Sequence, residues 1–422
     1  MLLTLAACAI LLSAAPATAG DSSTASPPDS AAGRAGALKV FFDCADCWDI
    51  DFIRAGITFV DHVRDPQQAD AHVLITTQNA ANGGSEVTLT IMGRGAYAAL
   101  RDTLRFTTKA ADSDHTVEQE AVRLLRLGLA RYAARTPLAG RLDVSYAAPA
   151  AAPPRQPTDR WSNWVFTADL NGWVNGESSK RALNTWGSLT ASRVRPVTKT
   201  SLSVGGSYYE NRFEVEGGHI LSASRSRNAN ARQVWGFGEH WSAEARLGAY
   251  TSTYSNMDLD WSAGPSLEFN AFPYSQSARR ELRFDYYMTF HRARYEHETI
   301  YFRTAESLWR QGVEVTLKSK EPWGSASITL SAFHYLHDLD KNWLNAYGDV
   351  SLRVAEGLSV KVSGNASRVR DQISLSAQGA TLEDVLLARR QLATQYQYYV
   401  SLGIKYTFGS IYSNIVNARF GS

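Results

Sequence analysis

The sequence lacks a long hydrophobic run. After the first twenty residues, no uncharged apolar stretch of the 422-residue chain reaches the ~18 residues that a membrane-spanning helix needs, so we do not expect a helical membrane protein. An excess of charge of one sign is also missing, because 43 Lys and Arg balance 41 Asp and Glu and leave a formal net charge of +2. This balance gives no support for a nucleic-acid partner.

Aromatic residues, in contrast, are abundant at 11% of the chain, and a period of two recurs between residues 161 and 408. In the last such segment the apolar side chains share one face: Tyr396, Tyr398, Val400, Leu402, Ile404, Tyr406 and Phe408. The opposite face is mostly polar, with Gln397, Ser401, Lys405 and Thr407. A membrane-spanning β-strand shows this alternation over roughly 9 to 11 residues, with apolar side chains toward lipid and polar ones toward the interior.

The same alternation recurs at residues 281–291 and 358–367. Counting such segments predicts an antiparallel transmembrane β-barrel of about 12 strands over residues 159–408, in the bacterial outer membrane. Short turns are expected near Pro196, Gly236, Tyr274, Pro322 and Gly357. The other connections are expected near residues 176, 217, 256, 297 and 338, with the longest at 372–387.

The segments before the barrel differ in character. Residues 1–19 read as a signal peptide, with an apolar run before the small-x-small sequence of residues 17–19. Residues 20–37 are rich in Ser, Ala, Pro and Gly and read as a flexible tether, and residues 147–158 form an Ala/Pro-rich linker. Lipidation at Cys8 is a less favoured alternative to signal cleavage.

A small α/β domain is expected between the tether and the linker, over residues 38–146. Strands are predicted at 39–43, 70–77, 86–92, 102–107 and 142–146, and a helix at 48–55. A longer helix is predicted over residues 117–132 from its helical apolar spacing, and the Asp and Ser residues at 112–114 supply its capping groups. The fold class is therefore α+β: a small α/β domain followed by a barrel.

Strand parity predicts where the ends of the chain lie. An even number of strands returns both ends of a barrel to the same side, and the short turns of such barrels face the periplasm. We therefore expect the α/β domain and the tail, residues 409–422, to be periplasmic. Lipid, lipopolysaccharide, the barrel assembly machinery and a periplasmic protein are the expected partners.

Cys44 and Cys47 form the sharpest local motif, between a predicted strand and a predicted helix. Thioredoxin-like enzymes place an active dithiol there, but Asp43, Asp46 and Asp49 surround it with negative charge that opposes thiolate formation. A structural disulfide is the favoured interpretation, permitted in an oxidising periplasm. A redox role and a metal site are the alternatives, and two thiolates fall short of the four ligands of a structural zinc.

The predicted strand phases point charged side chains into the lumen. Seven acids face inward: Asp169, Glu244, Glu268, Glu281, Asp285, Glu314 and Asp349. Six bases face inward with them: Arg246, Arg283, Lys318, Arg353, Lys361 and Lys405. Near-balance favours an interior cross-linked by ion pairs, or a weakly selective pore, over a pore selective for one sign of charge.

Other polar residues offer no clear catalytic pattern. His334, His337 and Asp338 lie at a strand end, and a polar loop is favoured there over a cation site; the same holds for His291 and His297. No Ser/His or Asp/His group stands out at the outer rim. We therefore expect a protein that is not an enzyme, with no cofactor and no metal.

Several short motifs carry a resemblance across the whole chain after the signal: Phe42-Asp43-Cys44 with Cys47, residues 57–60, 63–65 and 69–76, Gly238-Glu239-His240-Trp241, residues 322–325 and residues 407–410. In these the chain resembles a family of uncharacterised bacterial outer-membrane β-barrel proteins with an N-terminal periplasmic α/β domain. In layout, the strand at 69–75, the hairpin and the long helix resemble the N-terminal domain of the translocation protein TolB, a partner-binding module.

Two functional hypotheses follow. In the first, the barrel anchors a periplasmic interaction domain in the outer membrane. In the second, the barrel is a narrow passive channel or transporter for a small solute, gated or fed by the domain. The folded domain on a Pro-rich tether favours the first hypothesis, and the polar lumen permits the second.

Overall fold

The computed structural model describes residues 34–44, 50–80, 83–143, 145, 160–215, 218–378, 393–410, 412 and 414. The expected signal peptide, the linker and Cys47 lie outside these residues, as does most of the expected tether. The described chain forms a five-stranded sheet followed by a twelve-stranded sheet. The predicted fold class, a small α/β domain followed by about 12 antiparallel strands, is confirmed.

The N-terminal domain is a mixed sheet with helices. Its elements are β1 (Leu38–Asp43), α1 (Ile50–Gly56), β2 (Val60–His62), η1 (Pro66–Gln68), β3 (Ala71–Asn79), β4 (Ser85–Gly93), η2 (Gly95–Tyr97), β5 (Arg101–Thr107), α2 (Asp114–Ala133) and η3 (Ala139–Arg141). The strand order is β2-β1-β3-β4-β5. β1 pairs in parallel with β2 and β3, and the pairs β3–β4 and β4–β5 are antiparallel.

The long helix α2 closes the core of this domain. Its predicted cap is in place, because the Ser113 side chain accepts a hydrogen bond from the Thr116 backbone N–H. Leu125, Leu129 and Tyr132 are fully buried against the sheet. The Tyr132 hydroxyl donates to the Ile91 carbonyl oxygen at 3.1 Å, so the polar tip of this buried ring is satisfied.

One expectation for the domain needs correction, and one of its strands was not predicted. Leu142 and Asp143 do not form a strand; they follow the short turn η3, which redirects the chain after α2. The parallel strand β2 was not predicted, because three residues are too few to show a period of two.

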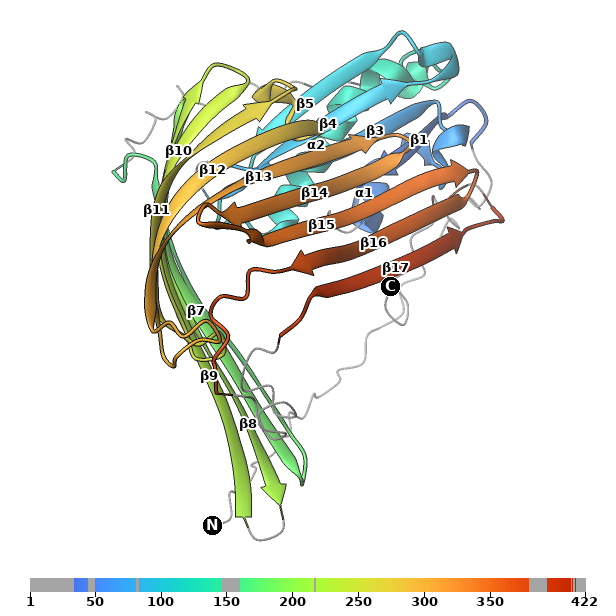
Figure 1. Cartoon of the computed structure of the whole chain (residues 1–422). Helices are drawn as coiled ribbons and strands as arrows, with labels where there is room; N and C mark the ends of the chain where they lie inside the picture. Colours follow the sequence, from blue (N-terminus) through green and yellow to red (C-terminus); the bar gives the residue numbers. More distant parts are fainter. Residues whose placement is uncertain are drawn as a thin grey trace.

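The second sheet holds twelve antiparallel strands: β6 (Trp164–Gly176), β7 (Lys180–Arg195), β8 (Thr198–Val215), β9 (Gly218–Phe237), β10 (Trp241–Ser252), β11 (Met257–Asn270), β12 (Arg280–Tyr295), β13 (Ala305–Glu321), β14 (Gly324–Tyr335), β15 (Asp338–Ala355), β16 (Leu358–Val369) and β17 (Tyr396–Tyr406). A short 3-10 turn, η4 (Tyr274–Gln276), lies between β11 and β12. Each strand pairs with its neighbours in sequence, and β6 and β17 form the two edges. Figure 1 shows this sheet strongly curved, with the two edge regions apart.

One face of this sheet is apolar and carries two rows of aromatic rings. Trp241 and Phe284 flank Phe269, with ring centroids 4.7 Å and 6.4 Å from it. Near the other strand ends, Trp261 and Trp309 flank Phe290 at 5.5 Å and 5.3 Å. Phe269 and Trp261 lie eight residues apart on β11, which is about 27 Å along a strand.

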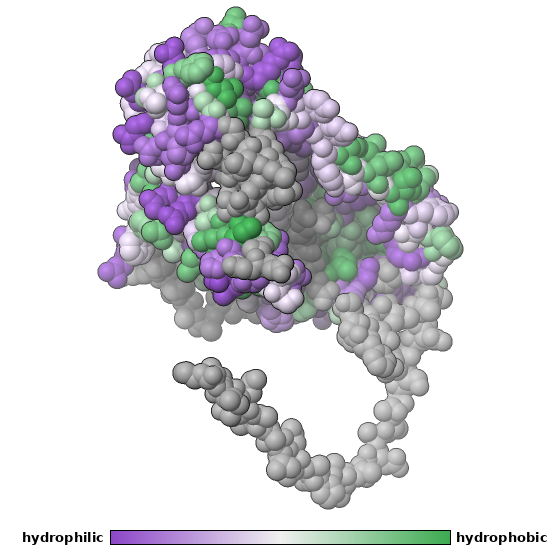
Figure 2. Space-filling view, turned by 60° about the horizontal axis from the view of Figure 1, so that its bottom comes forward, coloured by the Kyte–Doolittle hydropathy of each residue, from purple (hydrophilic) through white to green (hydrophobic). Residues whose placement is uncertain are grey.

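The opposite face is polar and concave. Ser201 of β8 and Glu314 of β13 line the same cavity of about 640 Å³. On a flat sheet these strands would be about 24 Å apart, so the sheet must curl toward this face. Figure 2 shows mostly hydrophilic residues over the upper left of this view and a patch of hydrophobic residues at the right.

Candidate functional site

The N-terminal domain is held against one end of the twelve-stranded sheet by a bidentate ion pair. The Arg353 guanidinium, near the end of β15, donates to both carboxylate oxygens of Asp43, at 2.6 Å and 2.7 Å. The same guanidinium donates to the Pro322 carbonyl oxygen of the β13–β14 turn at 2.9 Å. Planar two-point contacts of this kind fix orientation as well as distance.

Asp43 connects this contact to the core of the domain. Its carboxylate also contacts Nε2 of His72 at 3.0 Å, and the His72 side chain is 1% exposed. Burial raises the pKa of Asp43, but the hydrogen bonds from His72 and Arg353 outweigh burial and lower that pKa overall. The Arg353 guanidinium also lies 5.3 Å from the centre of the Phe41 ring. Asp43 is therefore ionised where the two units meet.

A second contact joins the short helix η1 to the next turn of the rim, between β15 and β16. Asp65 accepts the Gln67 backbone N–H at 2.7 Å and also accepts the Gly357 N–H from the β15–β16 turn. Gln68 donates to the Glu356 carboxylate of the same turn. Gly357 adopts a positive φ of 68°, a conformation that places its N–H toward the domain without strain.

The tail and the first strand add further contacts. Val63 forms an isolated antiparallel bridge with Tyr412, and the His62 backbone N–H donates to the Asn414 side-chain oxygen at 2.6 Å. At the other edge of the sheet, Val165 of β6 packs against Gly83 of the domain. A Cβ atom added to Gly83 would lie 3.0 Å from the nearest methyl carbon of Val165. The domain thus touches the rim near both edges of the sheet, and Figure 1 shows it at the end where β14 and β16 begin.

A cleft of about 360 Å³ lies between the domain and the rim. Phe41 and Phe42 line it from the domain, and four cationic side chains also line it: Arg54, Arg64, Arg353 and Lys405. His62 lines it too, and burial lowers the pKa of His62 to about 4, so its ring is neutral at ordinary pH. The cleft therefore combines aromatic walls with positive charge.

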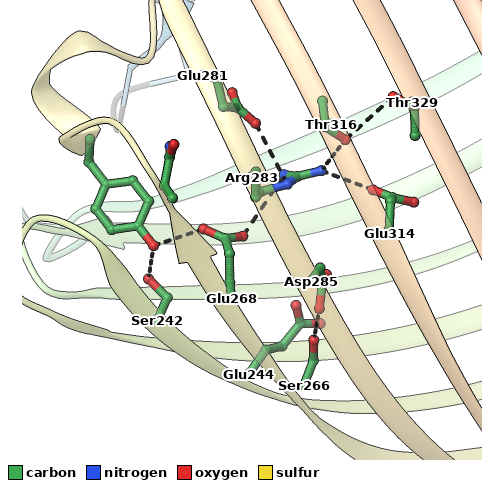
Figure 3. Close-up of polar contacts among 12 residues, drawn as sticks. Ser242, Glu244, Ser266, Glu268, Glu281, Arg283, Asp285, Glu314, Thr316 and Thr329 are labelled. Atoms are coloured by element: carbon green, nitrogen blue, oxygen red, sulfur yellow. Dashed lines mark hydrogen bonds and ion pairs between the residues drawn. The ribbon is translucent and has the colours of Figure 1, made fainter.

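The second candidate region is an ion-pair network on the concave face. Arg283 lies at its centre, with nitrogens 3.0 Å from Glu314, 3.6 Å from Glu281 and 3.9 Å from Glu268. Figure 3 shows these carboxylates converging on the guanidinium from three strands. Lys318 contacts Glu281 at 3.5 Å. One cation thus holds three carboxylates, which is the cross-linked interior that the sequence predicts.

The network continues toward β9 through residues on β10 and β12. Arg246 contacts Glu244 at 3.4 Å and Asp285 at 3.9 Å, and Glu244 also accepts from Arg232 at 2.8 Å. Arg246 lies 5.3 Å from the centre of the Tyr287 ring. Eight of the predicted inward charges therefore come together: Glu244, Arg246, Glu268, Glu281, Arg283, Asp285, Glu314 and Lys318.

Two arginines of the concave face were missed by sequence reasoning. Arg232 pairs with Glu244, and Arg310 lies 4.7 Å from the centre of the Phe333 ring and 5.9 Å from that of Tyr287. β9 carries arginines in both phases of its alternation, so its inward face could not be identified from sequence. Arg310 could have been identified, because it lies four residues before Glu314 in β13 and the alternation of a strand places both on the same face.

The remaining predicted charges lie apart from the network. Asp349 and Lys361 form their own ion pair at 3.1 Å, and Ser188 donates to Asp169 at 3.5 Å near the β6 edge. Arg353 and Lys405 lie at strand ends and face the domain rather than the middle of the concave face. Sequence reasoning could not place them there, because the domain's position was unknown.

At the opposite end of the sheet, the described start of the long β16–β17 connection folds back over the concave face. Ile373 is buried against Leu308 and Tyr335. The Ile300 backbone N–H donates to the Leu375 carbonyl oxygen at 2.8 Å, which ties this connection to the one between β12 and β13. His291, expected in a polar loop, lies instead in β12 and contacts Asp260 at 3.0 Å.

Cys44 is disulfide-bonded, and its expected partner Cys47 lies outside the described residues, so that pairing stays a prediction. His334 contacts the Gln311 side chain at 2.9 Å, while the His337 ring lies beside Tyr335. Within the part of the chain that the structure describes, no three His, Cys, Asp or Glu side chains are grouped to hold a metal ion.

Comparisons with known proteins give a structural resemblance at low sequence identity. No protein-family model matches the chain, and no curated protein is similar to it. Among solved structures, the chain is similar to the NanC porin, at 8% identity and a TM-score of 0.28, covering 57% of this chain and 99% of that one. Among the described residues, no helix is long and apolar enough to cross a membrane. The fold is shown by the two sheets themselves.

Proposed function

We propose that this protein is an outer-membrane β-barrel that holds its N-terminal domain at the periplasmic mouth. The observation that carries the proposal is the bidentate pair between Arg353 and Asp43, which joins the two units across their contact. The contacts of Asp65 and Gln68 with the next turn support it. The barrel acts as the anchor, and the domain is the part that meets periplasmic proteins. The protein is not an enzyme in this proposal.

The apolar face supports the membrane assignment. Its two aromatic rows are about 27 Å apart along β11, and a strand tilted by about 40° would bring them to roughly 20 Å along the membrane normal. Barrels in outer membranes carry an apolar band of about 25 Å between two aromatic girdles. Lipid and lipopolysaccharide would contact this face, and the barrel assembly machinery would insert it.

In the membrane we propose that β6 and β17 pair and close the sheet. Among the described residues these two strands are the edges and do not pair with each other. Each strand would leave a row of backbone N–H and C=O groups unsatisfied in hydrocarbon, at a cost of several kcal/mol per group. Closure removes both rows at once. The long apolar alternation of β17 fits a strand that faces lipid on one side.

The orientation rests on the connections. The domain contacts the turns after β13 and β15, which belong to the short set. Short turns face the periplasm in outer-membrane barrels, so the domain and the tail would lie there.

Fractionation combined with protease protection tests this proposal. We expect the folded protein in the outer-membrane fraction, with a heat-modifiable band on a gel. Protease added to intact cells should leave the domain uncut, and protease added after outer-membrane permeabilisation should release it. Recovery in the soluble periplasm, or cleavage of the domain in intact cells, would contradict the proposal.

A second candidate function, a narrow passage for a small polar solute, is favoured by one observation. The concave face holds a cavity of about 640 Å³ lined by charged and hydroxyl side chains. The domain at the rim would then act as a gate. Planar-bilayer recordings of the parent and of Arg353→Gln test this function: we expect discrete current steps that become more frequent in the variant. Silence from both proteins, with the barrel shown to be folded, would leave only the anchoring function.

A further inference from the structure

We propose that the cleft between the domain and the barrel rim binds a small organic anion with a carboxylate or phosphate group and a flat apolar body. This inference rests on the proposed docking of the domain, because both units supply its walls. Its volume of about 360 Å³ is at the lower end of the 300–1,000 Å³ typical of small-molecule sites, so a ligand of one ring fits best.

The charges in the cleft decide the sign of the ligand. Arg54 is paired with Asp51 at 2.7 Å, and Arg353 is paired with Asp43. Arg64 and Lys405 have no carboxylate partner among the described residues. Arg64 comes from the domain and donates to the Ser410 carbonyl oxygen, and Lys405 comes from β17. Two cations without a carboxylate partner among the described residues therefore line one cavity, one from each unit.

Asp65 offsets only part of this charge, because two cations against one carboxylate leave the cleft positive. Asp65 lines the cavity, but its carboxylate already accepts two backbone N–H groups, from Gln67 and Gly357. His62 is buried, and its Nε2 bonds the Ile57 carbonyl oxygen at 3.0 Å. A net positive, partly enclosed site favours an anion, because charge-assisted hydrogen bonds are about twice as strong as neutral ones.

The apolar part of the ligand is indicated by the aromatic wall. The Phe42 ring stacks on His62 with a centroid separation of 5.4 Å, and Phe41 stands beside the Arg353 guanidinium. Both phenylalanines line the cavity from the domain side. A ligand whose anionic group bridges Arg64 and Lys405 would lay its ring on this wall and would stabilise the docked arrangement.

Calorimetric titration of the full-length protein in detergent with phenyl phosphate as the probe tests this inference. We expect one saturable site per chain, weakened at least tenfold by Arg64→Gln and by Lys405→Gln. Lys109→Gln, which removes an exposed lysine of the domain, should leave the binding unchanged. Benzyl alcohol, which keeps the ring and lacks the anion, should not bind. A parallel titration with benzoate shows whether the site accepts a carboxylate, a phosphate or both. Saturable binding of either anion supports the site.

Absence of saturable binding by both anions, or equal binding by the parent and both cleft variants, would overturn the inference. Docking is followed separately, by adding Gln68→Cys and Glu356→Cys to the parent and to each cleft variant. The parent side chains at these two positions are in contact, so a short bismaleimide should cross-link the cysteines in the docked protein. Lost binding with an intact cross-link refutes the anion site alone. A lost cross-link in the protein without cleft substitutions refutes the docking on which the site depends.

Discussion

A substitution on the barrel rim should lower the stability of a domain more than 300 residues away in sequence. Arg353→Gln removes the cation that holds Asp43 while leaving the domain's own sequence unchanged. If the domain hung freely on its linker, this substitution would not affect its unfolding. If the domain is docked, the interaction energy adds to the free energy of unfolding of the domain.

The magnitude follows from the geometry of the pair. A hydrogen bond to a charged group contributes about 1.5–3 kcal/mol, and exposure reduces this contribution. The Arg353 side chain is 26% exposed and that of Asp43 is 13% exposed, so we expect a loss of about 1–2 kcal/mol. For a domain of this size such a loss lowers the melting temperature by about 4–10 °C. Asp43→Asn should cost more, because it also weakens the contact with the buried His72.

Helical circular dichroism at 222 nm reports this transition, since α1 and α2 of the domain are the α-helices among the described residues. A double-mutant cycle with Asp43→Asn isolates the coupling between the two side chains. Lys361→Gln is the matched control, because Lys361 pairs with Asp349 within the sheet. Equal domain melting in the parent and in Arg353→Gln, or an equal decrease in the control, would refute the docked arrangement.

Four further outcomes are expected. Folding lowers the pKa of His62 from the ordinary 6.5 to about 4, so the unfolded chain binds more protons than the folded one between these pH values. Domain stability should therefore decrease by up to about 3 kcal/mol as the pH falls from 6.5 to 4. His62→Asn should flatten this dependence in melts recorded over the same pH range. If Cys44 pairs with Cys47 as predicted, the closed loop has four residues, and Cys44→Ser should lower domain stability by about 2 kcal/mol under oxidising conditions without changing barrel assembly. Equal melting of variant and parent would count against the disulfide. Arg283→Leu leaves three carboxylates without their shared cation, so the temperature of the heat-modifiable gel shift should fall, and an unchanged shift would show that the network adds no stability. A chain that starts at Trp161 should still insert as a barrel, and failure to assemble would contradict two separable modules.

The strands of the larger sheet could be predicted because the side chains on one face of the sheet are mostly apolar and those on the other face are mostly polar. In β17 every second residue from Tyr396 to Tyr406 is apolar and the residues between them are mostly polar, and the structure confirms that strand. Helix α2 was predictable for a related reason, since its apolar spacing and the Ser113 cap are both local signals. Local patterns of this kind need no knowledge of the rest of the fold.

Docking could not be predicted, because no local pattern encodes it. Asp43 and Arg353 are 310 positions apart, and neither residue differs in its neighbourhood from an ordinary surface charge. Sequence reasoning assigned Arg353 and Lys405 to the lumen from their strand phase. The phase placed both on the polar face, but at the strand ends the domain supplies their surroundings.

The most direct test of the account is a cross-link across the docking contact in isolated outer membranes. Gln68→Cys and Glu356→Cys, treated with a short bismaleimide, should give an intramolecular cross-link in most molecules, because these side chains touch in the docked arrangement. The matched control pairs Gln68→Cys with Glu177→Cys, which lies in the β6–β7 connection at the other end of the sheet, and should give none. Equal yields from the two pairs, or no cross-link from the first, would contradict a domain held at the mouth of the barrel.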